Sequence, residues 1–491
     1  MHKQLPPGAL AGAASGVAFW LAREPLSVLM SCLWAGRATP SALARYQRKR
    51  LAALVAFARS RSAYYRALYA QLPAGASDLR ALPVVTKPDL MTHFDEWVTD
   101  PAVTRAGVEM FLSEPAPPGT DYLGRYAVWT TSGTTGKPGV FVHDRRAVLV
   151  YSTLVWLRTY RWVTPALLWP LLRRGRIVAL VATGGHFAIA DWFERKRRAV
   201  GARDRARVIS ALRPLAEIVR ELNDYQPALL TGYPSVIKLL AAEQSAGRLR
   251  IAPVYVGTGG ESLDVAARTQ IEAAFDCIMR DNYGASEFPY AATECGHGYL
   301  HINADWLIIE PVDAAYQPVP PGQPSCTALL TNLANRVQPL IRYDLGDSVT
   351  MKAEPCPCGR PLPAMRVEGR KGDILRMATP SGRMVALLPL ALGTVVEETP
   401  GVVRAQIIQT GPSELTLRLE IDPRAGAVEP DSVWRHVERR LREYLAAQGL
   451  ASVTLARGAE SPHADPVSGK YREVWSALPA SEAPAPRLDI R

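Results

Sequence analysis

The sequence predicts an α/β protein, with a large N-terminal α/β domain of mixed sheets with helices and a small, mobile C-terminal α+β domain. Short apolar runs that end in glycine, such as RIVALVATGG at 176–185, are typical of strands buried on both faces of a sheet. They alternate with segments of helical periodicity, which is the pattern of an α/β body. After about Gly372 the pattern changes, because SELTLRLEID at 413–422 alternates strictly and indicates a half-buried strand. We therefore expect domains over residues 1–371 and 372–491.

The chain begins with an apolar stretch over residues 8–36. Arg23, Glu24 and Pro25 interrupt it before it reaches the roughly 20 apolar residues that a membrane-spanning helix needs. It also lacks the cleavage region of a signal peptide. We expect a packed pair of N-terminal helices or a peripheral contact with a membrane, and no transmembrane segment.

Helices and strands then alternate along the large domain. Residues 42–69 have the periodicity of one helix. The apolar residues from Leu212 to Leu222 share one face of a second helix, and the short strands ALLTG at 228–232 and PVYVGTGG at 253–260 follow it.

The small domain contains one long amphipathic segment, residues 431–450. Asp431 is its expected N-cap and Gly449 stands at its end. Strand patterns on both sides make the segment part of a β-β-α-β unit.

Composition narrows the class of protein. The 491 residues are 48% apolar and 21% charged, as in soluble globular proteins, and their formal net charge is +11. The densest basic segment, residues 194–207, suits a solvated surface, with a phosphate contact, a carrier-protein dock or a membrane surface as alternatives. No zinc-finger spacing, aromatic RNA motif or basic zipper accompanies this charge, so we expect no nucleic acid partner. Six cysteines are too few for a disulfide scaffold, which favours a reducing, cytoplasmic location.

The segment TSGTTGKPG at 131–139 carries the first chemical signal. A Walker P-loop is excluded, because Thr131 stands in place of its first glycine and Pro138 in place of the hydroxyl that reaches magnesium. The segment is still a glycine-rich loop with several hydroxyl groups. Such a loop suits the wrapping of phosphate oxygens by backbone N–H groups and side-chain donors.

Six further motifs follow this loop in order. They are GYPS (232–235), GTGGESL (257–263), NYGASE (282–287), IRYDLGD (341–347), GRKGDILRM (369–377) and SGKYREV (468–474). The series resembles the adenylate-forming enzymes, the superfamily of acyl-CoA synthetases, luciferases and adenylation domains. Within it, the series and the early RSAYYRALY at 61–69 resemble the phenylacetate-CoA ligase branch, with its coenzyme F390 synthetase-like and capsule-biosynthesis members.

The resemblance implies a nucleotide site and roles for its residues. The nucleotide-binding set is Thr131, Ser132, Gly133, Thr134, Thr135, Gly136, Lys137, Gly259, Gly260, Glu261, Asn282, Tyr283, Gly284, Ala285, Ser286, Asp347 and Arg370. Glu287 resembles the magnesium ligand, because a hard cation bridging phosphate oxygens needs a carboxylate. Tyr283 would stack on adenine, and Asp347 would accept both ribose hydroxyls.

Three further positions carry the chemistry and the motion in this resemblance. Lys470 resembles the catalytic lysine that stabilises the transition state at the α-phosphorus, and Arg370 the ribose-phosphate partner. Asp373 matches the hinge about which the small domain rotates between two reactions.

The acyl pocket is less well defined by the sequence. His186, Tyr233 and Ala285 are its candidates, since they stand at strand ends or within the motifs. A structural histidine that contacts no ligand is an equal alternative for His186.

A group of cysteines and histidines also resembles a zinc cluster seen in some phenylacetate-CoA ligase-like proteins. The candidate ligands are Cys295, His301 or His297, Cys356 and Cys358. Buried free thiols are the alternative.

The resemblance implies a two-step ligase. A carboxylic acid would attack MgATP to form an acyl-adenylate and pyrophosphate, and a thiol, with coenzyme A as the usual acceptor, would then take the acyl group. Alternatives are transfer to a carrier-protein pantetheine or to an amine, and a catalytically inactive nucleotide-binding scaffold. We expect a monomer or a homodimer.

Overall fold

The computed structural model describes residues 24–73, 75, 78–114, 117–131, 139–159, 175–183, 186–199, 205–263, 265–370, 375–379, 381, 384–387, 389–397, 399–422, 430–464 and 471–478. Within these residues the strands form one nine-stranded sheet and four smaller sheets. The α/β class predicted from the alternating pattern is confirmed.

The nine-stranded sheet is the centre of the large domain. Its spatial order is β13 (Asp347–Met351), β14 (Ala364–Arg370), β9 (Leu300–Ile302), β8 (Phe288–Glu294), β7 (Ile278–Ala285), β6 (Tyr255–Gly259), β5 (Leu229–Gly232), β3 (Ile177–Val181) and β4 (Ala206–Ser210). Strands β4, β3, β5, β6 and β7 are parallel neighbours, and the pairs from β7 to β13 are antiparallel. The sheet is therefore mixed, with its parallel half on the side where the helices alternate with strands.

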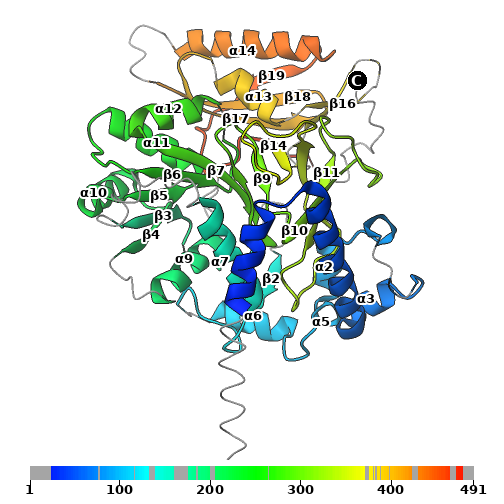
Figure 1. Ribbon diagram of the computed structural model, residues 1–491. Coiled ribbons are helices and arrows are strands. Elements are labelled where there is room, and N and C mark those ends of the chain that lie inside the picture. Colours follow the sequence, from blue (N-terminus) through cyan, green and yellow to red (C-terminus); the bar gives the residue numbers. More distant parts are fainter. Residues whose placement is uncertain are drawn as a thin grey trace, which may run out of the picture.

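Helices cover both faces of the parallel half (Figure 1). On one face lie α10 (Leu215–Tyr225), α11 (Pro234–Ser245) and α12 (Val265–Phe275), whose apolar residues pack on Val178, Leu230, Val256 and Met279. On the other face lie α7 (Arg145–Thr159) and α9 (Ala188–Ala199). Because side chains alternate along a strand, Ala179 and Val181 point to this second face.

The remaining elements of the large domain surround this layer. They are α2 (Pro40–Arg61), α3 (Ala63–Leu68), the 3₁₀ turn Leu79–Ala81, α4 (Lys87–Thr92), α5 (Phe94–Trp97), α6 (Arg105–Ser113), the hairpin β1 (Ala127–Thr130) and β2 (Val140–His143), and the three-stranded sheet of β10 (Leu307–Val312), β11 (Thr327–Asn332) and β12 (Tyr343–Asp344).

Two helix expectations in this domain were wrong in detail. The single helix expected over 42–69 is two helices, because Ser62 leaves the helical conformation and its hydroxyl caps α3 by accepting from Tyr65 N at 3.3 Å. Leu212 lies in a turn and not on α10, since Pro214 takes an extended conformation and the helix begins after it.

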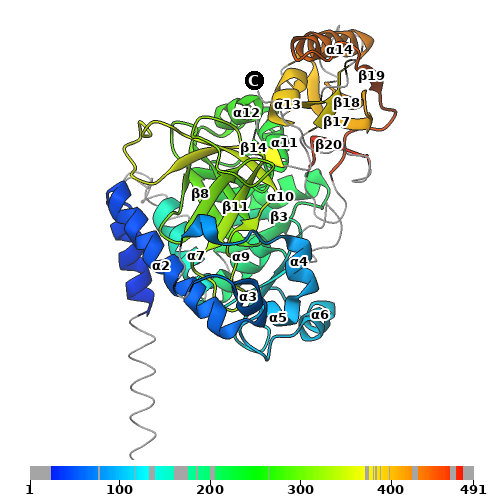
Figure 2. The same cartoon turned by 90° about the vertical axis from the view of Figure 1, so that its right-hand side faces the viewer.

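The C-terminal part has its own sheet, covered by α13 and α14 (Figure 2). Its buried apolar residues form a separate hydrophobic core. It contains β15 (Leu375–Ala378), β16 (Met384–Leu387), α13 (Pro389–Glu397), β17 (Val402–Gly411), β18 (Glu414–Ile421), α14 (Pro430–Ala447), β19 (Thr454–Arg457) and β20 (Val474–Ser476). The sheet order β19-β18-β17-β20 with α14 confirms the β-β-α-β unit. Asp431 is not the N-cap, because α14 starts one residue earlier; its carboxylate instead accepts from Arg457 at 2.8 Å.

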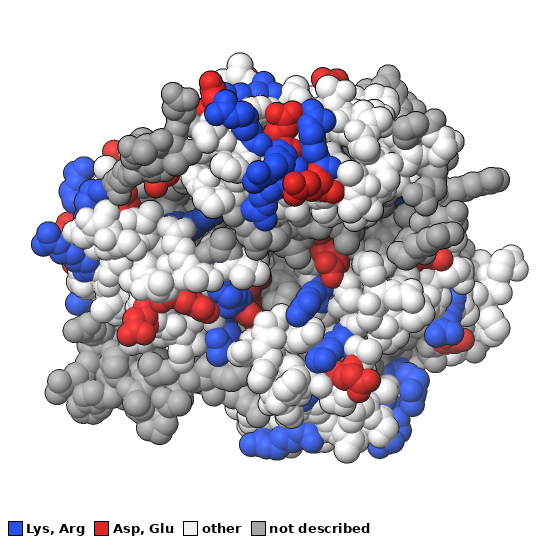
Figure 3. Space-filling view, turned by 90° about the horizontal axis from the view of Figure 1, so that it is seen from above, with Lys and Arg blue, Asp and Glu red and all other residues white. Residues whose placement is uncertain are grey.

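Charges of both signs are interspersed at the α14 end of the molecule (Figure 3). Arg442 bonds Glu438 at 2.7 Å along this helix, and Arg457 reaches Asp431 from β19. Because positive and negative side chains alternate here, the electrostatic potential is weaker than that of a patch with basic residues alone.

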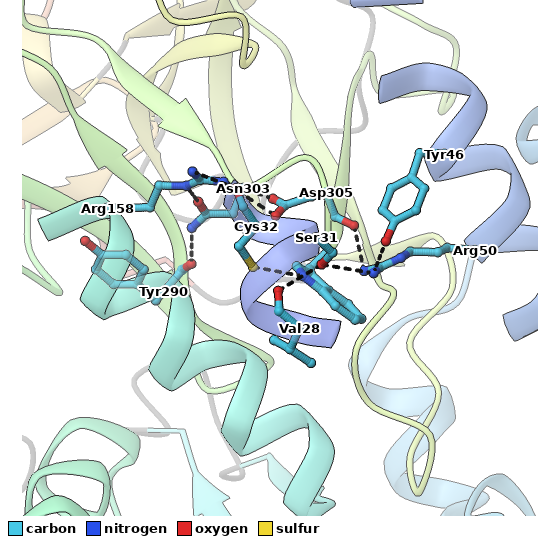
Figure 4. A network of polar contacts seen from close by, with 10 residues as sticks. Val28, Ser31, Cys32, Tyr46, Arg50, Arg158, Tyr290, Asn303 and Asp305 are labelled. Atoms are coloured by element: carbon cyan, nitrogen blue, oxygen red, sulfur yellow. Dashed lines mark hydrogen bonds and ion pairs between the residues drawn. The ribbon is translucent and has the colours of Figure 1, made fainter. Parts of the chain in front are cut away.

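The N-terminal helix over residues 24–35 is held on the body by buried polar contacts (Figure 4). The carbonyl of Cys32 accepts from Arg158 Nη1 at 3.3 Å, and the indole of Trp306 donates to the Cys32 thiol at 3.3 Å. Arg158 also pairs with the fully buried Asp305 at 3.4 Å. Burial raises the pKa of the Cys32 thiol to about 12, so this cysteine stays a neutral packing group.

The opposite side of the same helix exposes apolar side chains. Leu26 and Met30 are 58% and 56% exposed, and Leu33 and Trp34 lie beside them one to two turns later. Among the described residues, no helix combines the length and apolarity needed to cross a bilayer. The membrane contact suggested by the sequence stays a prediction.

Candidate active site

A cavity of about 570 Å³ opens at the carboxyl ends of β3, β5, β6 and β7. This is the place where open α/β sheets bind ligands. Ten residues singled out from the sequence line it: Thr131, Tyr233, Gly259, Gly260, Asn282, Gly284, Ala285, Ser286, Glu287 and Asp347. The fold therefore brings the motifs of residues 131, 232–235, 257–263, 282–287 and 341–347 to one site.

Glu287 supplies a carboxylate at the wall of this cavity. The residue is only 5% exposed and lies in the tight turn between β7 and β8. The Tyr343 hydroxyl donates to Glu287 Oε1 at 2.8 Å, and the Asn332 amide donates to the Glu287 carbonyl at 2.9 Å. Burial raises the pKa of the Tyr343 hydroxyl well above its usual range, so it remains a donor. The carboxylate is held in one orientation, which suits a ligand to a hard cation.

A buried histidine, His143, hydrogen-bonds to the same turn. His143 Nε2 donates to the carbonyl of Ser286 at 2.9 Å, and Nδ1 lies 3.1 Å from the Tyr151 hydroxyl. Complete burial lowers the pKa of His143 to about 3, so the ring is neutral. The Ser286 hydroxyl in turn donates to the carbonyl of Thr130 at 3.0 Å. These bonds connect the turn that carries Glu287 to β1 and β2, the two strands that the glycine-rich loop joins.

Asp347 and Tyr283 meet across the sheet. The Tyr283 hydroxyl donates to Asp347 Oδ2 at 2.6 Å. Asp347 begins β13 and is the register partner of Arg370 on β14, so the two residues implied as ribose partners stand directly opposite each other. Tyr283 is not among the residues that line the cavity, and its stacking on adenine stays a prediction.

Two glycines of the motifs are required by close strand packing. A Cβ at Gly284 would lie 2.0 Å from the carbonyl oxygen of Pro289, and a Cβ at Gly259 would lie 2.6 Å from that of Asn282. No side chain fits at either position. The neighbouring backbone lies so close that only glycine fits at these two positions, and this explains both glycines without a bound ligand.

The structure describes only the ends of the glycine-rich loop at 131–139. Thr131 N donates to the carbonyl of Gly139 at 3.0 Å, and Gly139 N donates to the Thr131 hydroxyl at 2.8 Å, which closes the base of the loop. Residues 132–138, with Ser132, Gly133, Thr134, Thr135, Gly136 and Lys137, lie outside the described residues, as do Asp373 and Lys470. The same holds for the side chain of Arg370.

Glu261 connects the two parts of the chain. Its Oε2 accepts from Ser235 N at 3.1 Å at the start of α11, and its Oε1 accepts from Tyr471 N at 2.5 Å. Tyr471, the residue after Lys470 in the sequence, therefore contacts the GTGGESL motif.

The three candidates for the acyl pocket differ in position, and Ala285 is among the residues that line the cavity. Tyr233 lines the cavity and is buried; its hydroxyl accepts from Ala182 N at 3.3 Å. The ring of His186 packs against Phe111, 5.4 Å between centroids, and the residue is not among those lining the cavity. The next residue, Phe187, lines it instead.

Four side chains form a compact group beside β9 and β14. The ligand atoms of Cys295, His301, Cys356 and Cys358 all lie within 4.8 Å of one another. Cys295 Sγ is 3.6 Å from Cys356 Sγ, and Cys358 Sγ is 3.1 Å from His301 Nε2. His301 Nδ1 donates to the carbonyl of Leu362 at 2.9 Å, which leaves Nε2 free to bind a metal. Of the two histidines considered, His301 belongs to this group; His297 does not and is exposed.

Sequence reasoning missed several residues of the cavity. Lys87 lines it as the first residue of α4, although no motif marked this lysine. Tyr343 was inside a quoted motif, but its contact with Glu287 has no signal in the sequence. The apolar wall that α7 and α9 contribute, which includes Trp156 and Trp192, was also missed. In a sequence, apolar residues on a helix that line a cavity have the same pattern as residues that pack in the hydrophobic core.

Comparisons with known proteins give two relatives by sequence and a solved structure of similar fold. No protein-family model matches the chain. The chain is 26% identical over 373 residues to phenylacetate-coenzyme A ligase of Thermus thermophilus, covering 73% of this chain and 76% of that protein. It is 28% identical over 166 residues to Protein CapK of Staphylococcus aureus, covering 32% of this chain and 34% of that protein. The crystal structure of 2-hydroxyisobutyryl-CoA ligase in the postadenylation state, in complex with R3-HIB-AMP, matches with a TM-score of 0.64 and 20% identity over 88% of both chains.

Proposed function

We infer that this chain, a phenylacetate-CoA ligase-like member of the adenylate-forming enzymes, is an AMP-forming carboxylate ligase. The observation that carries the proposal is one cavity lined by Glu287, Asp347 and the glycine-rich ends of β6 and β7. These are residues that the superfamily uses for magnesium, ribose and adenine. Their assembly at strand carboxyl ends supports nucleotide activation as the chemistry of the site.

In the first reaction a carboxylate oxygen of the acid attacks the α-phosphorus of ATP. A new C(O)O–P bond forms, the bond between the α-phosphorus and the bridging oxygen breaks, and pyrophosphate leaves. Thr131 and the loop to Lys137 would bind the β- and γ-phosphates, and Asp347 would accept the ribose hydroxyls. Lys470 would stabilise the charge that develops around the α-phosphorus.

Magnesium fits the residues present, because Glu287 offers a buried, oriented carboxylate at the cavity wall. When bound, the ion supplies positive charge that neutralises the phosphate oxygens and favours pyrophosphate as the leaving group. The chain's own contribution is to hold the carboxylate with Tyr343 and to fix its turn with His143 and Ser286.

In the second reaction a thiolate attacks the acyl carbonyl carbon of the adenylate, a thioester forms, and AMP leaves. We propose coenzyme A as the acceptor, supported by the similarity to a phenylacetate-coenzyme A ligase. A carrier-protein pantetheine or an amine are the alternative acceptors. The proposal includes rotation of the small domain, residues 372–491, about Asp373 between the two reactions.

We also propose a structural zinc ion in the Cys295, His301, Cys356 and Cys358 group. Tetrahedral zinc with Zn–S bonds of about 2.3 Å places two thiolates roughly 3.8 Å apart. The observed separation of Cys295 and Cys356 Sγ, 3.6 Å, fits this geometry. The ion would join the end of β8 to the loop before β14, about 60 residues apart in the chain, and not take part in the reaction.

ATP–pyrophosphate exchange driven by a panel of carboxylic acids tests the proposal. We expect at least one acid to support exchange and Lys470→Ala to lower it by 100-fold or more, since electrostatic stabilisation of a transition state is worth several kcal/mol. Lys49→Ala is the matched control, because Lys49 is exposed on α2, away from the cavity. Absence of exchange with every acid, together with intact ATP binding, would favour the inactive scaffold.

The acceptor is tested separately with the acid that supports exchange. The adenylate is formed and challenged in parallel with coenzyme A, a pantetheinylated carrier protein and an amine, and AMP release is measured. Release that depends on coenzyme A alone supports the proposed acceptor. Release with the carrier or the amine alone would assign the alternative.

A further inference from the structure

The cavity does not end at the carboxyl ends of the strands. Its lining also includes Ile177, Leu229 and Tyr255, the first residues of β3, β5 and β6. These three are register partners, so they form a row across the amino ends of the strands. The cavity therefore runs the whole length of these strands along one face of the sheet.

Two helices form the walls of this extension. The first, α7, packs against β8 and contributes Val155, Trp156 and Thr159, while α9 packs against β3 and β4 and contributes Trp192 and Phe193. The extension is lined by residues of both helices and of β5 and β6. We call this part, from Val181 and Gly232 at one end to Ile177, Leu229 and Ala206 at the other, the acyl channel.

The wall of the channel is mainly apolar, and its described polar groups include the buried Tyr255 hydroxyl and, at the far end, Arg197 and Arg205. Trp156 is 56% exposed although it borders the cavity, so a hydrophobic ligand would cover it. The hydroxyls of Thr159 and Tyr290 lie 2.7 Å apart and hydrogen-bond to each other, so they do not need a polar group from a ligand. Among the described lining residues the acids are Glu287 and Asp347, and both belong to the nucleotide end. At the far end Arg197 is paired with Glu194 at 2.8 Å and Arg205 is exposed, so the tail of a ligand would meet these two cations only where it leaves the apolar part of the channel.

The length of the channel sets the length of its occupant. From Ile177 to Val181 the strand advances four residues, or about 13 Å at 3.3 Å per residue. An extended hydrocarbon of about ten carbons spans this distance, since each C–C bond of about 1.5 Å advances a zigzag chain by a little less than its length. A single aromatic ring or a short branched acid would fill only the end near Gly259.

We propose that the acyl substrate is an extended aliphatic carboxylic acid of about ten to twelve carbons, whose carboxylate lies at the nucleotide end and whose tail occupies the acyl channel. The inference rests on the proposed function, because it names the substrate class of that site. It also assigns Trp156 and Ala206 as residues that determine chain length, one along the wall and one at the far end.

The test measures ATP–pyrophosphate exchange with straight-chain acids from four to sixteen carbons, with phenylacetate and 2-hydroxyisobutyrate alongside. We expect kcat/KM to rise by up to about fourfold with each added methylene to a maximum near decanoate, and to fall for longer chains. Phenylacetate or 2-hydroxyisobutyrate as the preferred acid would overturn the inference and leave the proposed ligase in place. No exchange with any acid would overturn the proposed function itself.

Two variants separate the channel from the reaction. Ala206→Phe fills the far end, so kcat/KM for decanoate should fall at least tenfold and the preferred chain should shorten by three or four carbons, while hexanoate stays within twofold of wild type. Ala252→Phe, on an exposed loop before β6, is the matched control and should change neither acid. Trp156→Ala, at an exposed position that folding tolerates, should weaken decanoate at least fivefold more than hexanoate. Equal effects of these variants on both acids would contradict the placement of the tail.

Discussion

The hydrogen bond from Tyr343 to Glu287 is the most direct test of the assigned metal ligand. Tyr343→Phe removes one hydroxyl and leaves the ring in its packing, so no large cavity forms. The Glu287 carboxylate is nearly fully buried and loses a donor that lies 2.8 Å away. A hydrogen bond to a charged group contributes about 1.5–3 kcal/mol, which corresponds to roughly 10- to 100-fold in an equilibrium constant.

We expect this loss to appear in the binding of MgATP. The carboxylate of the variant should populate orientations that do not face the phosphates, so the magnesium concentration for half-maximal binding should rise by about tenfold or more. Titration calorimetry of ATP at several magnesium concentrations measures this directly and needs no knowledge of the acid. Exchange activity at saturating magnesium should recover toward the wild-type rate, since Tyr343 is a positioning residue and does not touch the reacting atoms.

A matched control separates this effect from lost stability. Tyr65 is equally buried and its hydroxyl donates to the carbonyl of Pro339 at 2.9 Å, away from the cavity. Tyr65→Phe should lower the melting temperature without changing the magnesium dependence. If Tyr343→Phe folds and its magnesium dependence stays within twofold of wild type, Glu287 is not the ligand or its orientation does not depend on Tyr343.

Three further outcomes follow from the same structure. Gly284→Ala should destabilise the fold by about 2 kcal/mol or more, because its Cβ would lie 2.0 Å from a backbone oxygen, whereas Gly296→Ala, with its nearest neighbour at 3.5 Å, should be near neutral in thermal unfolding. The pKa of His143 is lowered to about 3 from an ordinary value near 6.5, so its contribution to stability is complete above pH 6.5 and is lost as the pH falls toward 3. Denaturant unfolding of wild type should therefore lose up to ~1.4 kcal/mol more per pH unit in that window than His143→Gln, and identical slopes would refute the assignment. Purified protein should contain about one equivalent of zinc by elemental analysis, and Cys356→Ser should lose the metal and melt at lower temperature, whereas the exposed His297→Ala should retain it.

Much of the fold could be predicted because it depends on local patterns. The run at 176–185 is apolar on both faces and became β3 in the parallel half of the sheet. The strict alternation at 413–422 became β18, which has a core face and a solvent face. Helix boundaries were less predictable, because a single residue can set them while the apolar periodicity continues on both sides. Ser62 separates α2 from α3, and Pro214 sets the start of α10.

The motifs predicted which residues share the site, and the structure decided what each one contacts. Glu261 was expected only as a member of the nucleotide site, and the structure shows that its carboxylate accepts from Ser235 N and Tyr471 N. His186 was a candidate for the acyl pocket or a structural histidine, and the structure shows its ring packed on Phe111. A sequence motif records that residues occur together, and it carries no information about the direction in which a side chain points.

By itself the sequence determined the α/β class, the change of pattern near Gly372, and the order of motifs that meet at the strand ends. Tertiary structure alone decided three things: that His301 and not His297 joins the three cysteines, the bond between Tyr343 and Glu287, and the extension of the cavity along the strands. The physical reason is the same in each case. Periodicity encodes which face of an element is buried, but contacts between distant elements, and the space left between two helices over a sheet, depend on how those faces pack together.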